Sequence, residues 1–249
     1  MLTQILPIVR EAGEIIRGFY RTELLVSLKA DRSPCTQADV QANDRLISGL
    51  AKAFPQIPAI SEESAAVPFE ARKGWRRFFL IDPLDGTKDF IQMTGEFTVN
   101  VALIEDGVPT LGAVYAPALD LLYYAASGQG AFKSENGAEA RRIFSNPPDR
   151  KAGIISLESR HHGNSAELEN YLSGVSVRER LCVGSSLKFC YLAEGRAHVY
   201  PRFGPTMEWD VAAGDCIWRN AAPKGLNSSP LTYNKPTLKN GPFVLGSLE

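Results

Sequence analysis

The hydrophobic positions near the start of the chain predict two amphipathic helices. Apolar side chains recur at steps of three and four from Leu2 to Phe19, and a second helix is expected from about Thr36 to Phe54. The side chains expected on the buried face of this second helix are Val40, Ile47, Leu50 and Phe54. Between the helices, the polar stretch from Val26 to Asp31 is typical of a short strand.

Short apolar runs replace the helical spacing from Arg77 onward. The continuous run Phe78–Ile81 predicts a buried strand that ends at Asp82. The strands expected after it, separated by turns, are Phe97–Ile104, Leu111–Tyr115 and Leu121–Ala125. Together these segments predict an antiparallel meander.

Strand and helix patterns alternate beyond residue 150. The expected elements are strands at Ile154–Ile155, Val175–Val183 and Ala197–Tyr200, and helices at Ser185–Glu194 and Asp210–Arg219. The chain is therefore predicted to have an α+β half, residues 1–140, followed by an α/β half, residues 141–249. We expect the halves to pack tightly as one unit with a site between them.

The composition of the chain limits the kinds of molecule that the protein could bind and where it could be located. The chain has 249 residues, 44% of them hydrophobic, with 27 basic and 28 acidic side chains and a formal charge of -1. Such a balance excludes disorder and provides no basic field for a nucleic acid polymer. No apolar run approaches the roughly 18 residues of a membrane span, and charged residues interrupt any signal peptide. We expect a cytoplasmic protein, with peripheral association at the cytoplasmic face of the inner membrane as the alternative.

The segment Asp82–Thr87 has the strongest chemical pattern. Asp82 and Asp85 are three residues apart at the end of the predicted strand, with Pro83 and Gly86 favouring a sharp turn. Two carboxylates and the intervening Leu84 carbonyl are suitable ligands for one hard cation. These residues alone leave a plain surface turn as the alternative.

Single residues exclude two further kinds of site at this segment. A calcium EF-hand loop needs glycine at its sixth position and glutamate at its twelfth. If the loop began at Asp85, Phe90 would occupy the sixth position; if it began at Asp82, Met93 would occupy the twelfth. A phosphatase with an aspartyl nucleophile would need a carboxylate where Pro83 stands.

Further carboxylates are available elsewhere in the chain. Glu62 and Glu63 follow an apolar pair, and Asp210 lies at the expected start of a helix. Two divalent cations about 4 Å apart would need more ligands than Asp82 and Asp85 provide. The alternatives are a solvated acidic loop and an ordinary helix cap.

Asp39 has two possible roles. It lies three residues after Thr36, as in a variant capping box at the head of the second helix. An aspartate paired with a hydroxyl such as that of Thr87 is also a means of holding and deprotonating a water molecule.

The order of these motifs resembles that of the lithium-sensitive, magnesium-dependent inositol monophosphatase superfamily. The shared elements are Ser61–Glu63, Asp82–Thr87 and Trp209–Asp210. Further segments are similar to those of the CysQ-type 3'(2'),5'-bisphosphate nucleotidases: Asp82–Lys88, Gly95–Asn100, Gly184–Cys190 and Tyr200–Thr206. The resemblance covers nearly the whole chain, weakens after about Trp218, and implies a layered α/β/α/β/α fold.

The resemblance also implies a set of metal ligands. Glu62, Asp82 and the Leu84 carbonyl would bind one ion, while Asp82, Asp85 and Asp210 would bind a second, with two or three Mg²⁺ per site. These ions would activate a water molecule and stabilise charge on the leaving oxygen, without a covalent phosphoenzyme.

Two more groups of residues receive roles from the resemblance. Thr87 and Asp39 would orient and activate the attacking water, and Lys188 and Arg202 would contact the phosphate that is not cleaved. An exposed helix lysine is the alternative for Lys188. The full set of expected substrate contacts is Glu62, Leu84, Asp85, Gly86, Thr87, His162, Ser185, Lys188, Arg202 and Asp210.

The predicted function is a Mg²⁺-dependent phosphatase. The resemblance implies removal of the 3'-phosphate of adenosine 3',5'-bisphosphate, with the sulfated nucleotide as a further candidate substrate, in sulfur assimilation or nucleotide recycling. The nearest alternative is an inositol or sugar phosphatase. A nucleotide-binding regulator without catalysis is a third hypothesis.

Overall fold

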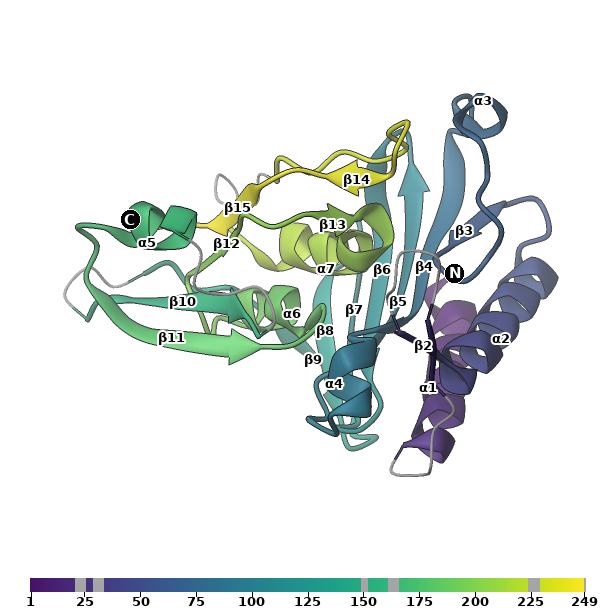
Figure 1. Cartoon of the computed structure of the whole chain (residues 1–249), viewed down its shortest axis with the longest axis horizontal. Coiled ribbons are helices and arrows are strands. Elements are labelled where there is room, and N and C mark those ends of the chain that lie inside the picture. The colour runs from purple at the N-terminus through teal and green to yellow at the C-terminus, as the bar shows by residue number, and fades with distance from the viewer. Residues whose placement is uncertain (21–25, 29–33, 149–151, 161–165, 224–228, 249) are drawn as a thin grey trace.

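The chain folds into five alternating layers of helices and sheets (Figure 1). The computed structural model describes residues 1–20, 26–28, 34–148, 152–160, 166–223 and 229–248. In order, the layers are helices α1 and α2, a seven-stranded sheet, helices α6 and α7, a four-stranded sheet, and helix α5. The helix bounds are α1 Leu2–Phe19, α2 Gln37–Ala53, α5 Ala166–Leu172, α6 Leu187–Ala193 and α7 Glu208–Ala221. The predicted α/β/α/β/α order is confirmed.

The outer helical layer matches the predicted helices closely. Both α1 and α2 begin and end within about one residue of the expected positions. In α2, Thr36 caps the first turn and Phe54 follows the last turn. The burial of Val40 was predicted wrongly, since 48% of this residue is exposed. The small residues Ala38 and Ala42 face the sheet instead, and they let the helix approach the strands closely.

The central sheet is mostly antiparallel. Its strand order follows the sequence from β3 to β9, and only β3 pairs in parallel, with β4. The strand bounds are β3 Ala59–Ser61, β4 Arg77–Asp85, β5 Thr98–Glu105, β6 Val108–Ala116, β7 Leu121–Ala126, β8 Gly130–Glu135 and β9 Arg141–Ile143. The predicted meander is confirmed and extends further, through β8 and β9, than the apolar runs indicated.

Strand β4 is covered on both faces, which explains its continuous apolar run. Phe79 and Ile81 pack against the α1–α2 layer, while Phe78 and Leu80 pack toward the α6–α7 layer. The pairing of β4 with β5 shifts between Asp82 and Asp85, where three steps along β4 match two along β5. This bulge turns the acidic motif out of the regular ladder.

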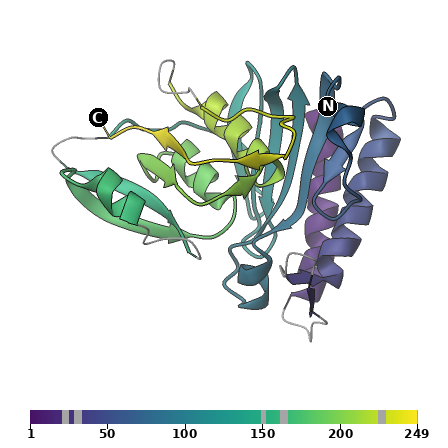
Figure 2. The same ribbon diagram turned by 45° about the horizontal axis from the view of Figure 1, so that its top comes forward.

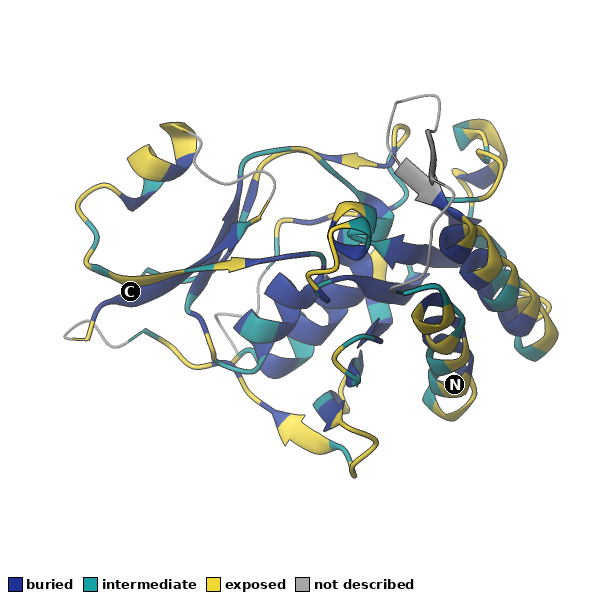
Figure 3. Cartoon of the chain, turned by 60° about the horizontal axis from the view of Figure 1, so that its bottom comes forward, coloured by how far each residue is buried: buried dark blue, intermediate teal, exposed yellow. Residues whose placement is uncertain are grey.

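The second sheet has the strand order β11, β10, β12 and β15, with β15 antiparallel to β12. The bounds are β10 Ile154–Ser159, β11 Val177–Val183, β12 Val199–Arg202 and β15 Phe243–Gly246. Helices α6 and α7 lie between the two sheets and are largely buried (Figure 3). Figure 2 shows the C-terminal segment, in yellow, running past α7 toward the four-stranded sheet. The division at residue 140 stays a prediction.

Short elements complete the described chain. They are β1 Val26–Leu28, β2 Pro34–Thr36, α3 Phe69–Arg72, α4 Thr87–Ile91, β13 Thr206–Met207 and β14 Lys239–Asn240. Helix α4 begins directly after Gly86, which adopts a φ of 90°. Within the parts of the chain that the structure describes, none of the helices is both long and apolar enough to cross a lipid bilayer.

Candidate active site

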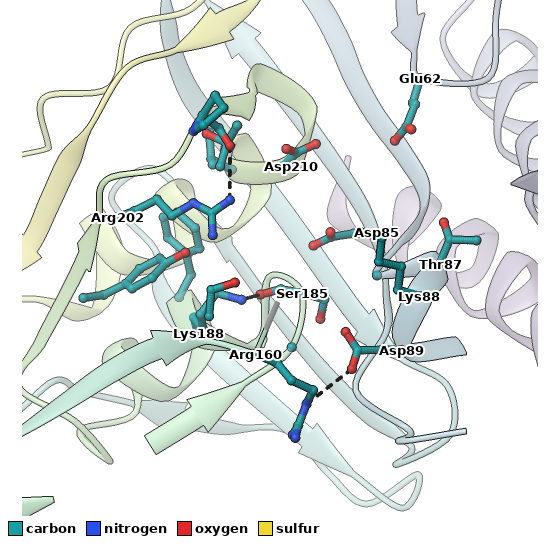
Figure 4. A pocket seen from close by; sticks show the side chains of 18 residues that line it. Glu62, Asp85, Thr87, Lys88, Asp89, Arg160, Ser185, Lys188, Arg202 and Asp210 are labelled. Atoms are coloured by element: carbon teal, nitrogen blue, oxygen red, sulfur yellow. Dashed lines mark hydrogen bonds and ion pairs between the residues drawn. The ribbon is translucent and has the colours of Figure 1, made fainter. Parts of the chain in front are cut away.

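A pocket of about 280 Å³ lies between the seven-stranded sheet and the C-terminal half (Figure 4). Its walls come from residues 85–89 on one side and from α6, α7 and strand β12 on the other. The lining residues that bear charge are Glu62, Asp85, Lys88, Asp89, Arg160, Lys188, Arg202 and Asp210. Acidic and basic side chains therefore face one cavity from different elements.

Two residues that line this pocket, Glu62 and Asp210, form a cluster of three carboxylates with the buried Asp82. Glu62, Asp82 and Asp210 each place an oxygen within 4.8 Å of the other two. Parallel pairing of β3 with β4 sets Ser61 beside Ile81, and this places Glu62 next to Asp82. Asp210 approaches from the first turn of α7 and also accepts a hydrogen bond from the Met207 amide at 2.8 Å.

The donor chemistry fits a divalent cation. Carboxylates this close repel one another unless positive charge lies among them. Burial raises the pKa of Asp210 well above its usual range, and the neighbouring Asp85 carboxylate raises it further. Oxygen ligands of this kind suit Mg²⁺ or a similar hard ion. The expected ligands Glu62, Asp82 and Asp210 are thus brought together.

Asp85 lies in the same pocket and is held by neighbours from other elements. Its Oδ2 atom is 3.1 Å from the Ser186 hydroxyl and 3.4 Å from the Asn100 amide nitrogen. Burial raises the pKa of Asp85, whereas the positive charge of Lys188 and these hydrogen bonds oppose the rise.

Asp39 makes the contacts that each of its two expected roles requires, one with each carboxylate oxygen. Its Oδ2 atom accepts hydrogen bonds from the Thr36 amide at 2.7 Å and the Thr36 hydroxyl at 2.6 Å, which completes the cap of α2. Its Oδ1 atom lies 3.3 Å from the hydroxyl of Thr87. That hydroxyl is also 3.3 Å from the Leu84 carbonyl, so one threonine touches two expected site residues.

Two basic side chains of the pocket, Lys188 on α6 and Arg202 on β12, are buried. Lys188 is 5% exposed and donates to the carbonyls of Val183 at 3.1 Å and Ser185 at 2.6 Å. Arg202, 8% exposed, donates to the carbonyls of Gly204 and Pro205, each at 3.1 Å. The alternative of an exposed helix lysine is therefore wrong for Lys188.

Burial also changes the pKa of Lys188. Removal from water lowers its pKa to about 8, the nearby Asp85 carboxylate opposes this effect, and Arg202 adds to it. The two cations stay close because each is anchored by backbone carbonyl groups. An incoming anion would meet positive charge that is already in place.

Close packing joins the two sides at Gly86 and Ser185. A Cβ atom on Gly86 would lie 3.3 Å from the Glu96 carbonyl and 3.4 Å from the Ser185 Cβ, so glycine suits this position. Ser185 adopts a φ of 48°, and its buried hydroxyl has no hydrogen-bond partner among the described residues. His162 lies outside the described residues.

Known proteins are similar to this chain over most of its length. The model of the inositol monophosphatase family matches residues 1–227. The 3'(2'),5'-bisphosphate nucleotidase CysQ of Salmonella typhimurium is 45% identical over 219 residues, which cover 87% of this chain and 86% of the relative. The chain belongs to the inositol monophosphatase family.

Solved structures agree with this assignment. CysQ from Bacteroides thetaiotaomicron superposes with a TM-score of 0.82 at 36% identity, covering 99% of this chain and 97% of that one. The Thermotoga maritima IMPase has a TM-score of 0.72 at 25% identity, covering 87% and 81%. The predicted resemblance to the family and to its CysQ members is confirmed. Family membership and the acidic cluster together support a divalent metal cofactor.

Some pocket residues were not anticipated from the sequence. Arg160 forms ion pairs with Asp89 at 3.3 Å and Glu96 at 2.5 Å, and the Glu96 carboxylate also accepts from the Gly184 amide at 2.7 Å. No spacing signal identifies such a residue, because Glu96 is 64 positions from Arg160 and 88 positions from Gly184. Only tertiary packing brings them to the pocket.

Proposed function

We propose that the protein is a Mg²⁺-dependent 3'(2'),5'-bisphosphate nucleotidase that removes the 3'-phosphate of adenosine 3',5'-bisphosphate. The observation that supports this most strongly is one pocket with an acidic cluster at one end and the buried pair Lys188 and Arg202 at the other. The CysQ relatives, similar over most of the chain, are named 3'(2'),5'-bisphosphate nucleotidases. Sulfur assimilation or nucleotide recycling is the process in which we place it.

The acidic end would hold the metal. In this proposal Glu62, Asp82 and the Leu84 carbonyl bind one Mg²⁺, and Asp85 and Asp210 join Asp82 around a second. Bound Mg²⁺ would acidify a water molecule and offset the charge of the phosphate to be cleaved. The mutual approach of three carboxylates supports such a site.

Thr87 and Asp39 would handle the attacking water. The Thr87 hydroxyl can accept a hydrogen bond from water while donating to Asp39, and the Asp39 carboxylate can take up the proton that water loses. Asp39 is fixed for this task because its second oxygen is occupied by the backbone and side chain of Thr36. The cap of α2 thus orients the proposed base.

The basic end would bind the second phosphate. Lys188 and Arg202 face the pocket from α6 and β12, and Ser185 presents a hydroxyl without a protein partner among the described residues. A nucleotide with two phosphate groups would satisfy both ends of the pocket. An inositol monophosphate has no second phosphate for Lys188 and Arg202 to bind.

A phosphate-release panel tests this function. Purified protein would be assayed with adenosine 3',5'-bisphosphate, its sulfated form, inositol-1-phosphate and fructose-1,6-bisphosphate, each with Mg²⁺ and with chelator. We expect the highest kcat/KM for the nucleotide bisphosphate, and a large loss of turnover with Asp85→Asn. A higher kcat/KM for inositol-1-phosphate would favour the phosphatase alternative. A nucleotide that binds and persists uncleaved in Mg²⁺ would favour the regulator.

A further inference from the structure

Asn100 and Ser186 meet at the junction between the two ends of the pocket. Both residues are 1% exposed, and neither lines the pocket. The Asn100 amide donates to the Ser186 hydroxyl at 2.9 Å. The Ser186 hydroxyl in turn lies 3.1 Å from Asp85 Oδ2 and 2.6 Å from the Asp210 backbone carbonyl. Two proposed metal ligands are therefore contacted by one hydroxyl.

These contacts join four separate elements. Asn100 belongs to β5, directly opposite Asp82 in the sheet register, and Asp85 ends β4. Ser186 immediately precedes α6, the helix that carries Lys188. Asp210 lies in the first turn of α7. A movement at this junction would therefore shift the acidic and the basic ends of the pocket relative to each other.

The Ser186 hydroxyl and the Asn100 amide differ in how many hydrogens they can donate to their neighbours. The Ser186 hydroxyl has one hydrogen and two acceptors within reach, Asp85 Oδ2 and the Asp210 carbonyl. The Asn100 amide group can donate two hydrogens, and its nitrogen lies 2.9 Å from the Ser186 hydroxyl oxygen and 3.4 Å from Asp85 Oδ2. Asp85 can therefore keep a donor from Asn100 when Ser186 donates to Asp210.

In its present orientation, the Asn100 side-chain amide leaves its oxygen atom without a hydrogen bond from the described residues. This Oδ1 atom is buried. A buried polar atom in this state is unfavourable unless the arrangement gains elsewhere. The gain here is that the amide nitrogen lies within hydrogen-bond distance of both the Ser186 hydroxyl and Asp85 Oδ2.

We infer that Asn100 and Ser186 are positioning residues that set the Asp85 carboxylate for metal binding and hold α6 in register with it. The inference rests on the proposed function only in taking Asp85 as a metal ligand. Partners that orient metal-binding carboxylates commonly change metal affinity by about 10- to 100-fold when removed. A merely structural contact would alter stability and leave metal affinity unchanged.

Metal titration without substrate tests the inference. Isothermal titration with Mg²⁺ would be run on the wild-type chain, Ser186→Ala and Asn100→Ala. The control is Ser156→Ala, which removes another fully buried hydroxyl, located in the four-stranded sheet; unlike the Ser186 hydroxyl, it has no hydrogen-bond partner among the described residues. We expect the Kd for Mg²⁺ to rise about 10- to 100-fold in the first two variants and to stay within about twofold in the control.

Folding is checked separately by thermal unfolding in chelator. If Ser186→Ala does not fold, Asn100→Ala carries the same test, since it removes the other side-chain donor to Asp85. Folded variants with the wild-type Kd would overturn the inference. A wild-type chain that binds no Mg²⁺ would instead contradict the proposed function, so the two failures are distinguishable.

A double-mutant cycle locates the effect at Asp85. In an Asp85→Asn background, Ser186→Ala should change the Kd for Mg²⁺ by less than about twofold, because the carboxylate it orients is already gone. Equal effects in both backgrounds would show that Ser186 acts through another group and would overturn the assignment to Asp85.

Discussion

The two ends of the pocket differ in how their charged side chains are stabilised. At the acidic end, Glu62, Asp82 and Asp210 face one another, and burial with mutual repulsion raises the pKa of Asp210. At the basic end, Lys188 and Arg202 are each held by two backbone carbonyls. The basic end is organised by the chain itself, whereas the acidic end needs a cation to complete it.

This difference predicts which changes to the pocket should reduce activity most. Loss of the cation removes a component that the protein does not supply. Loss of one basic side chain leaves its partner and the surrounding carbonyl groups in place. We therefore expect changes at the acidic end to exceed those at the basic end.

The largest expected effect is metal removal. Chelation should lower the rate of phosphate release by more than about 10³-fold, because both water activation and charge stabilisation depend on the cation. Adding Mg²⁺ in excess of the chelator should restore the rate. Full activity in chelator, with metal content checked by elemental analysis, would contradict the metal-dependent mechanism.

The next effect tests water orientation. Thr87→Ala should lower kcat by about 10²- to 10⁴-fold with a small change in KM, because the Asp39 carboxylate would lose its contact with the hydroxyl that we propose orients the water. Thr87→Ser keeps the hydroxyl and should retain much more activity. Equal losses in both variants would indicate a packing role for the Thr87 methyl group.

A smaller effect is expected at the basic end. Lys188→Ala should lower kcat/KM for adenosine 3',5'-bisphosphate by about 10- to 100-fold, the value of one charge-assisted hydrogen bond. The same variant should change kcat/KM for inositol-1-phosphate by less than about threefold. A similar loss for both substrates would show that Lys188 supports the whole pocket and not the second phosphate.

The smallest effect is a pH dependence. Burial lowers the pKa of Lys188 to about 8, so the side chain is charged below that pH and becomes neutral above it. Between pH 7 and pH 9, kcat/KM for the nucleotide bisphosphate should fall by up to about tenfold relative to inositol-1-phosphate. Lys188→Arg keeps the charge and should flatten this ratio. An unchanged wild-type ratio would contradict the prediction.

Local sequence predicted much of the fold. The spacing of apolar residues marks α1 and α2, because a helix with one buried face repeats every three to four positions. The run Phe78–Ile81 marks β4, since a strand covered on both faces needs no polar alternation. Val40 shows the limit, because an apolar residue next to the buried stripe can still face solvent.

The acidic motif was also visible in the sequence. Asp82, Asp85 and Gly86 lie within five residues, and their chemistry is local: carboxylates, a bulge and a glycine with positive φ. Their partners Glu62 and Asp210 carried weaker signals that the family resemblance strengthened. The roles of the individual site residues remain predictions that the experiments above address.

Tertiary structure alone decided which side chains support the site. Asn100 and Ser186 are 86 positions apart, and the family-like segments that contain them give neither residue a role, yet both contact Asp85 and each other. Lys188 is spaced like a surface lysine, but packing of α6 between two sheets buries it and changes its pKa. The sequence by itself determined the helices, the central strands and the acidic motif, because these depend on neighbouring residues. Burial and long-range hydrogen bonds depend on how layers stack, so only the folded chain determined them.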